Sequence, residues 1–146
     1  MEAAKCSTRA GPRAAVASRH SSAFAIPWAG LGDRSGRFPR EIRLRAAEDF
    51  QRVLRARRRE SGRWFLVCAA DSPMGHARLG IVVGRSALAL AVLRNRIKRV
   101  ARERFRQRAE RLGPQDIVVR LRVGPTRDEF PAAEAELDRL LQKLER

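Results

Sequence analysis

The residues best suited to chemistry lie in one basic run, residues 94–99, with the sequence RNRIKR. Arginine carries a planar guanidinium that can hold a phosphate through two hydrogen bonds and can stack on a base. The basic character continues to Arg111, and Glu103 and Glu110 are the only acids in between. Such a segment is suited to binding a polyanion, with an affinity that falls as salt is added.

The whole chain shares this charge. Its 146 residues include 32 Lys and Arg against 16 Asp and Glu, which gives a formal net charge of +16. Lysine occurs only at positions 5, 98 and 143, so nearly all of the positive charge is arginine. The excess favours a polyanionic partner but does not by itself distinguish DNA, RNA and a membrane surface.

The sequence has few residues of the types that catalyse reactions or bind metals. The two histidines, His20 and His76, and the two cysteines, Cys6 and Cys68, are too far apart in the chain to suggest a zinc site. No Ser/His/Asp arrangement or cluster of carboxylates is evident, so we expect no catalytic residue and no metal held by the protein alone. The cysteine content is typical of a reduced, cytoplasmic protein. No apolar run reaches the roughly 18 residues of a membrane helix, so we expect no membrane association.

A single helix must position the basic run. The spacing predicts a helix from residue 91 to about 112, ended by Gly113 and Pro114. On a helical wheel one arc is apolar and predicts the buried side. That arc holds Leu93, Ile97, Val100, Ala101 and Phe105. The opposite side is cationic with one amide, and its members are Asn95, Lys98, Arg99, Arg102 and Arg106.

A solvated helix face is the ordinary explanation for such a pattern. Solvated faces usually mix signs to gain favourable pairs four residues apart, whereas Arg102 here follows Lys98 and precedes Arg106 at that spacing. Each like-charge pair costs a few tenths of a kcal/mol, roughly, and a bound polyanion would remove that cost. We therefore favour a phosphate-binding face. The helix alone would also suit the major groove of DNA, so periodicity does not decide between DNA and RNA.

The remaining periodic segments predict an α+β fold in which helices pack on one small sheet. They are a helix at 46–54, strands at 63–70, 77–84 and 116–123, and a helix at 129–144. We expect strand 77–84 to run antiparallel to strand 63–70, because Pro73 and Gly75 supply a turn between them. The arginines at 57–59 are interpreted as a solvated helix end, with contact to an RNA backbone as the alternative.

The first 36 residues differ in composition and show no sustained apolar period. We interpret residues 1–36 as a disordered basic tail, or as the product of a start site placed too far upstream. An acid-poor transit peptide is a third possibility. The folded domain is expected to span residues 37–146.

Residues 91–106, AVLRNRIKRVARERFR, resemble the RNR signature of the bacterial ribonuclease P protein family. Residues 78–83, RLGIVV, resemble the family's strand before the signature, and the segment from Leu44 to Phe50 resembles the entry to its first helix. The similarity covers about residues 38–144. It implies a small sandwich resembling the second domain of ribosomal protein S5, with a mixed sheet of about four strands. It also implies a left-handed βαβ crossover through the basic helix, against the usual rule.

The resemblance also implies a function, that of the protein subunit of ribonuclease P. The signature helix would bind the catalytic RNA through Arg94, Asn95, Arg96, Lys98, Arg99 and Arg102, with Arg106 continuing the same face. A cleft between the first helix and the sheet would bind the 5′ leader of precursor tRNA through Phe50, Leu54 and Phe65. The holoenzyme cleaves one phosphodiester bond to give the mature tRNA 5′ end. In the family the chemistry belongs to magnesium bound by the RNA subunit, so this chain would be an accessory subunit.

The chain departs from the family at three places. Residues 85–90, RSALAL, lack most of the expected basic residues, and Leu54 and Cys68 stand where aromatic residues are expected. Phe50 and Phe65 could also be ordinary core residues. The competing hypothesis is a ribosomal or other structural RNA-binding protein. A DNA-binding helix-turn-helix is disfavoured, because it needs a helix just before the basic one and residues 79–84 predict a strand.

Overall fold

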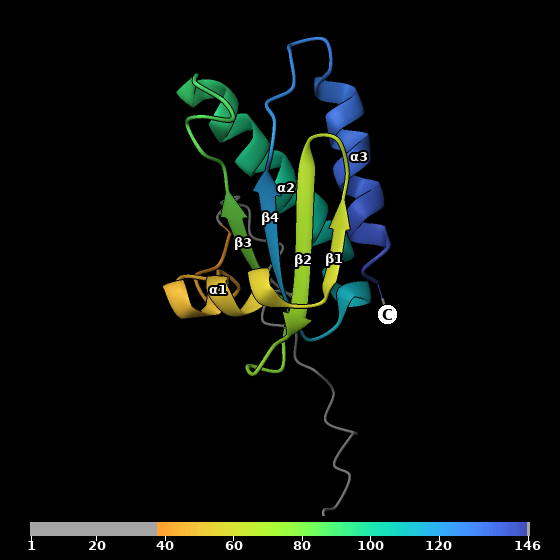
Figure 1. Ribbon diagram of the computed structural model, residues 1–146. Coiled ribbons are helices and arrows are strands. Elements are labelled where there is room, and N and C mark those ends of the chain that lie inside the picture. Colours follow the sequence, from red (N-terminus) through yellow and green to blue (C-terminus); the bar gives the residue numbers. More distant parts are fainter. Residues whose placement is uncertain (1–37, 146) are drawn as a thin grey trace, which may run out of the picture.

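The computed structural model describes residues 38–145, and the predicted tail at 1–36 lies outside the described residues. Figure 1 shows the helices packed around one sheet. In chain order the elements are α1 (Ala47–Arg55), β1 (Arg58–Ser61), β2 (Phe65–Asp71), β3 (Arg78–Val82), α2 (Ala91–Leu112), β4 (Gln115–Leu121) and α3 (Phe130–Gln142). The α+β class and the span of the basic helix are therefore as predicted.

The sheet has the strand order β1-β2-β4-β3. β4 lies in the middle, antiparallel to β2 and parallel to β3. β3 therefore runs antiparallel to β2, as expected, but the two strands do not pair as a hairpin, because β4 lies between them. The reason is visible in the burial of β4, where every residue except Arg120 is buried. A strand covered on both faces belongs in the centre of a sheet.

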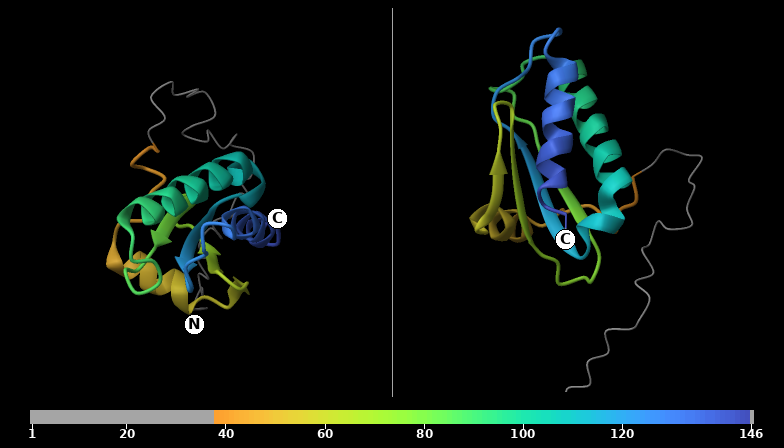
Figure 2. Two further views of the ribbon diagram at one scale, coloured as in Figure 1. Left: turned by 90° about the horizontal axis from the view of Figure 1, so that it is seen from above. Right: turned by 90° about the vertical axis from the view of Figure 1, so that its right-hand side faces the viewer.

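The connection from β3 through α2 to β4 is left-handed. In Figure 1 both strands point the same way, β4 lies to the right of β3, and α2 lies behind the sheet. Figure 2 shows α2 on the same side of the sheet as α3. With its helix behind the sheet, a right-handed crossover would place the second strand on the left. The mixed sheet of four strands and its unusual crossover agree with the predicted fold.

Helices pack on both faces of the sheet, and each face buries its own cluster of apolar side chains. α2 and α3 cover one face with the larger core, whose fully buried members include Ile97, Phe105, Leu137 and Leu141. α1 covers part of the other face, which we call the α1 face, and buries Val53 there. The apolar arc predicted for the basic helix packs against the larger core.

The arginine run at 57–59 does not end a helix, which corrects the sequence interpretation. α1 ends at Arg55, and the chain then turns into the edge strand β1, where Arg58 pairs with Ala69 of β2. The Nη1 of Arg58 donates to the Oε1 of Gln115 at 2.8 Å. A strand made of RRES has no apolar alternation to reveal it, because at the edge of the sheet most of its side chains face solvent.

Candidate nucleic-acid interface

The basic ridge of α2 consists of Asn95, Lys98, Arg99, Arg102 and Arg106. Asn95, Arg99 and Arg106 are exposed, while Lys98 and Arg102 are half-buried. Lys98, Arg99 and Arg102 form no hydrogen bond or ion pair with any residue that the structure describes. Arg106 lies 3.8 Å from Glu103 through Nη1 and Oε2. Three neighbouring cations of the ridge are thus available to a ligand, and no acid of the described chain neutralises them.

The inner edge of the ridge borders a cavity of about 190 Å³ beside β3. Lys98, Arg102 and Arg43 line it together with the rings of Phe38 and Phe50, and none of its lining residues is acidic. Burial lowers the pKa of the Arg102 guanidinium, and the neighbouring charge of Arg43 lowers it further. Like charges crowded around a hollow favour occupation by an anion.

The two arginines of the RNR signature are engaged within the protein. Arg94 donates from Nη1 to the carbonyl oxygen of Leu88 at 2.9 Å and to that of Ala89, which ties the loop before α2 to the helix. Arg96 lies over the Phe130 ring of α3 at 4.5 Å from its centroid, and its Nη2 is 3.6 Å from Glu134. The helical wheel groups neither residue with the ridge, and the structure shows what each one touches instead.

The α1 face carries two of the three residues predicted for the leader. The Phe50 ring lies directly on Gly80 of β3, where an added Cβ would stand 2.6 Å from the ring's Cε1. Leu54 follows one helical turn later and, like Phe50, packs against the buried cluster of the α1 face. Both are half-buried, so each still offers part of its surface to a ligand.

Phe65 does not join them, which corrects the predicted trio. It is 1% exposed and belongs to the larger core between the sheet and α2 and α3, on the opposite face from Phe50. Residues alternate along a strand, and Leu66, not Phe65, points toward α1. Strand periodicity separates the two faces but does not say which helix covers which, so the sequence offered no signal for this choice.

Cys68 lies under α1 and is 1% exposed. Burial raises the pKa of its thiol, an effect that the positive charges of Arg59 and Arg120 oppose only in part. A protonated, enclosed thiol is a packing residue. The floor of the α1 face is therefore aliphatic at the position where the family resemblance predicted an aromatic ring.

α1 is fixed to the sheet by a buried carboxylate. The Asp116 side chain has no exposed surface, and its two oxygens accept from Nε and Nη2 of Arg78 at 2.7 Å each. The guanidinium of Arg52 on α1 also donates to Asp116. Asp49 on α1 accepts from Nη1 of Arg78 at 3.2 Å. This network ties Asp49 and Arg52 of α1 to Arg78 of β3 and Asp116 of β4. It therefore sets the position of Phe50 on the α1 face.

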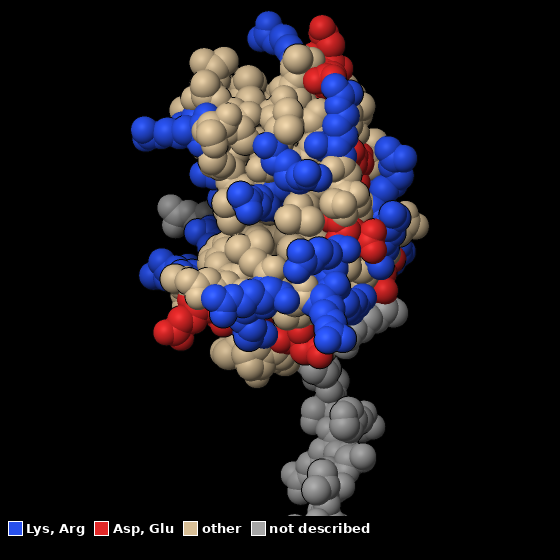
Figure 3. Space-filling model, viewed as in Figure 1, with Lys and Arg blue, Asp and Glu red and all other residues tan. Residues whose placement is uncertain are grey.

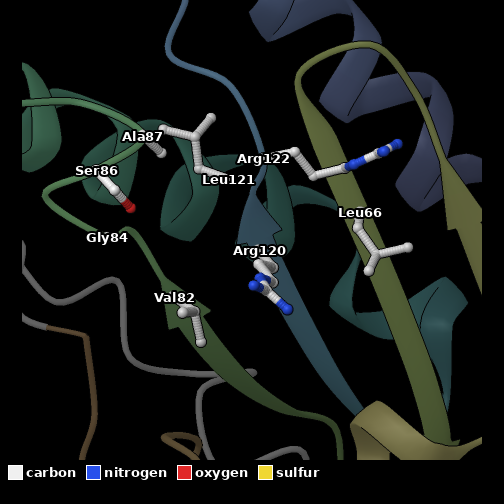
Figure 4. Close-up of a pocket in the computed structure, with 8 residues that line it drawn as sticks. All are labelled: Leu66, Val82, Gly84, Ser86, Ala87, Arg120, Leu121 and Arg122. Carbon is white, nitrogen blue, oxygen red and sulfur yellow. The ribbon is translucent and has the colours of Figure 1, made fainter.

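Above α1 the same face opens into a cavity of about 380 Å³ (Figure 4). Its lining residues are Leu66, Val82, Gly84, Ser86, Ala87, Arg120, Leu121 and Arg122. Leu66 and Val82 are the register partners of Arg120 on either side, so the three form one row across the sheet. Neither Leu66 nor Arg120 was predicted as a site residue. In the sequence, Arg120 alternates with the apolar Val119 and Leu121, which is typical of a strand with one solvent-facing side.

Basic side chains are widely spread over the α1 face. Figure 3 views this face and shows Lys and Arg across much of it, with Asp and Glu gathered toward its lower and right-hand margins. Within residues 38–145 no group of three or more His, Cys, Asp or Glu could hold a metal ion. Among the described helices, none is long and apolar enough to cross a membrane.

The fold and the site define an α+β nucleic-acid-binding protein, with a left-handed β-α-β unit that presents an arginine-rich helix beside an open sheet face. Comparison with known proteins identifies the family. Residues 38–145 match the Ribonuclease P family. The ribonuclease P protein component of Chromobacterium violaceum is 39% identical over 110 residues, which cover 75% of this chain and 91% of that protein. That of Bordetella avium is 46% identical over 91 residues, which cover 60% and 76%. The chain belongs to the ribonuclease P protein family.

Solved structures agree with this assignment. The RNase P protein from Thermotoga maritima has a TM-score of 0.57 and 31% identity, and the match covers 71% of this chain and 98% of that one. The RNase P protein from Staphylococcus aureus has the same TM-score and identity, with coverage of 70% and 91%. The predicted family and fold are therefore confirmed.

Proposed function

We propose that this chain is the protein subunit of a ribonuclease P holoenzyme, in which it binds the catalytic RNA and the 5′ leader of precursor tRNA. It thereby assists the cleavage that produces the mature tRNA 5′ end, in the cytoplasm. Family membership supports the assignment to ribonuclease P. The observation that carries the RNA-binding part is the trio Lys98, Arg99 and Arg102, three adjacent cations without an intramolecular partner among the described residues.

We assign the catalytic RNA to the ridge. Asn95, Lys98, Arg99, Arg102 and Arg106 would meet RNA phosphates and bases directly. Arg94 and Arg96, which the resemblance also implies as RNA contacts, would act mainly by holding the loop before α2 and the α2–α3 packing that present the ridge. A-form RNA does not admit a helix into its major groove, so the ridge would bind the backbone and unpaired regions of a folded RNA.

We assign the leader to the α1 face. Phe50 and Leu54 offer apolar surface, and Arg59 and Arg120 supply positive charge nearby. This combination of a basic surface with a stacking side chain is typical of proteins that bind single strands. Phe65 has no part in this assignment, because it is enclosed on the other side of the sheet.

The protein would contribute binding, and the RNA would contribute catalysis. Magnesium bound by the RNA subunit would supply the chemistry of hydrolysis, as a Lewis acid and a source of activated water. We place those ions on the RNA subunit. The cations of the ridge and of the α1 face would reduce the repulsion between two RNAs that must lie against each other.

Reconstitution tests the proposal. The purified chain is mixed with a bacterial ribonuclease P RNA and a precursor tRNA at low magnesium, and the 5′ cleavage rate is compared with that of the RNA alone. We expect the protein to raise the rate. An equal rate would exclude the subunit role, and equally tight binding to unrelated structured RNAs would then favour a ribosomal or other structural RNA-binding protein.

The Phe50→Ala holoenzyme tests the leader assignment. It should bind precursor tRNA more weakly, because a stacking or packing contact is worth about 1–3 kcal/mol per base. Mature tRNA should bind as before. Met74→Ala is a matched control, because Met74 is an exposed apolar side chain in the loop between β2 and β3. An equal loss for precursor and mature tRNA would contradict the assignment.

A further inference from the structure

The cavity above α1 contains the one cation of β4 that projects from the middle of the sheet. Arg120 lies on the central strand, with Leu66 of β2 and Val82 of β3 as its neighbours in register. It is exposed, whereas the other residues of β4 are buried. A long charged side chain in the centre of a sheet face gains little from packing there, so its presence calls for a partner.

No such partner exists within the described residues, where Arg120 forms no hydrogen bond or ion pair. Its neighbour Arg122 differs, because its Nη1 donates to the carbonyl oxygen of Gly62 at 3.4 Å. In Figure 4 Arg122 extends toward β2, while Arg120 stands between Val82 and Leu66. The positive charge in the cavity is therefore free, and no acid lines the cavity to neutralise it.

The walls suit a nucleotide better than a phosphate alone. Leu66 and Val82 give an apolar floor, and the loop at residues 84–87 forms a wall whose polar side chain is Ser86. A volume of about 380 Å³ lies within the range of small-molecule sites. An apolar floor accepts the flat face of a base, while a guanidinium accepts the phosphate beside it.

The cavity is separate from the Phe50 contact but close to it. Phe50 lies on Gly80, and Val82 is two residues further along β3, a distance of about 7 Å along a strand. Residues that alternate in this way face the same side of the sheet. A single-stranded RNA lying along β3 on the α1 face would therefore contact Phe50 and Arg120 in succession.

We infer that this cavity is a nucleotide subsite, in which Arg120 binds a phosphate of the leader and Leu66 and Val82 support the attached base. The inference rests on the proposed function, since it takes the leader to be the strand on the α1 face. It adds a second contact to that of Phe50, and it assigns an affinity-determining role to a residue outside the RNR signature.

The test measures the affinity of the reconstituted holoenzyme for precursor tRNAs whose leaders grow one nucleotide at a time, and for mature tRNA. In Arg120→Gln we expect about fivefold weaker binding once the leader reaches the subsite, and unchanged binding of shorter leaders and of mature tRNA. Phe50→Ala should lose affinity at a different leader length. Arg111→Gln is the control, because Arg111 is also exposed and unpartnered among the described residues but lies at the far end of α2.

The salt dependence of precursor tRNA binding tests whether Arg120 contacts a phosphate. Loss of a phosphate contact to a single strand should reduce the slope of log K against log salt by about 0.7, and Arg120→Lys should restore most of it. An unchanged slope with weaker binding would overturn the phosphate assignment. Wild-type affinity of Arg120→Gln at every leader length would overturn the subsite, provided that the wild-type holoenzyme gains affinity from the leader. If the wild-type protein gains none, the proposed function itself fails.

Discussion

Gly80 is the position where the smallest change should disturb the leader-binding face most. A methyl group added there would lie 2.6 Å from Cε1 and 2.8 Å from Cζ of Phe50, and 3.2 Å from the Cβ of Leu44. Carbon atoms in contact prefer about 3.5–4.0 Å, so the Phe50 ring must lift from the sheet by roughly 1 Å. Overpacking of this kind typically costs about 1–3 kcal/mol. Because the ring is half-buried and can swing outward, we expect Gly80→Ala to cost about 1–2 kcal/mol.

Urea unfolding measures that cost as a loss in the free energy of unfolding, and holoenzyme binding to leader-bearing tRNA measures its functional effect. Both should fall together, since the displaced ring is the one proposed to contact the leader. The combination with Phe50→Ala isolates the contact. When the ring is absent, the two closest contacts of the added methyl group are removed and only that with the Cβ of Leu44 remains, so we expect a coupling of about 1 kcal/mol between the two substitutions.

Gly84→Ala provides the matched control. An added Cβ there meets only the hydroxyl oxygen of Ser86, at 3.4 Å, and the substitution should leave stability within about 0.5 kcal/mol. Equal losses in the free energy of unfolding at positions 80 and 84, or additive losses for Gly80→Ala and Phe50→Ala, would refute the close packing of Phe50 on β3 from which the magnitude is calculated.

Three further predictions concern charge. Arg99→Gln should reduce the slope of log K against log salt for binding the ribonuclease P RNA by about one, whereas Arg94→Gln should weaken binding without changing the slope, because Arg94 contacts loop carbonyls. Asp116→Asn should lower the free energy of unfolding by about 3 kcal/mol in urea, since it removes the buried carboxylate that pairs with the largely buried guanidinium of Arg78. The hydrogen bond from Arg108 lowers the pKa of Asp138, so Asp138 stabilises the fold above the usual aspartate pKa of about 4 and less so as pH falls below it. The destabilisation caused by Asp138→Asn should therefore shrink in unfolding measurements below about pH 4.

The hydrophobic periodicity of the sequence predicted those helices and strands whose two sides differ strongly in polarity. The apolar arc around Ile97 located α2 and its buried side, because the pattern persists over six helical turns, roughly. β1 escaped prediction, because an edge strand with polar side chains shows no alternation. The place of β4 between β2 and β3 also lay beyond local patterns, since it depends on which distant strands pair.

The same limit applies to the site. The wheel placed Lys98, Arg99 and Arg102 on one side, and the structure shows them without partners among the described residues. It could not show that Arg96 lies over Phe130, because that contact joins two helices far apart in the sequence. Nor could it place Phe65 away from Phe50, because the choice between two faces of a strand depends on where each helix packs.

The central position of β4 has a consequence for how the chain is made. Synthesis delivers β1, β2 and β3 before β4, yet β2 and β3 pair with β4 and not with each other. Until residue 121 has left the ribosome, the nascent chain can form the β1–β2 hairpin and the short bridge between Arg43 and Leu79 of β3, while one edge of β2 and the edge of β3 that pairs with β4 stay unpaired. The arginine-rich helix emerges during this interval, before the sheet that supports it exists. A chain interrupted before Gln115 would thus carry the entire RNR segment without a framework to present it, and its open strand edges would favour aggregation.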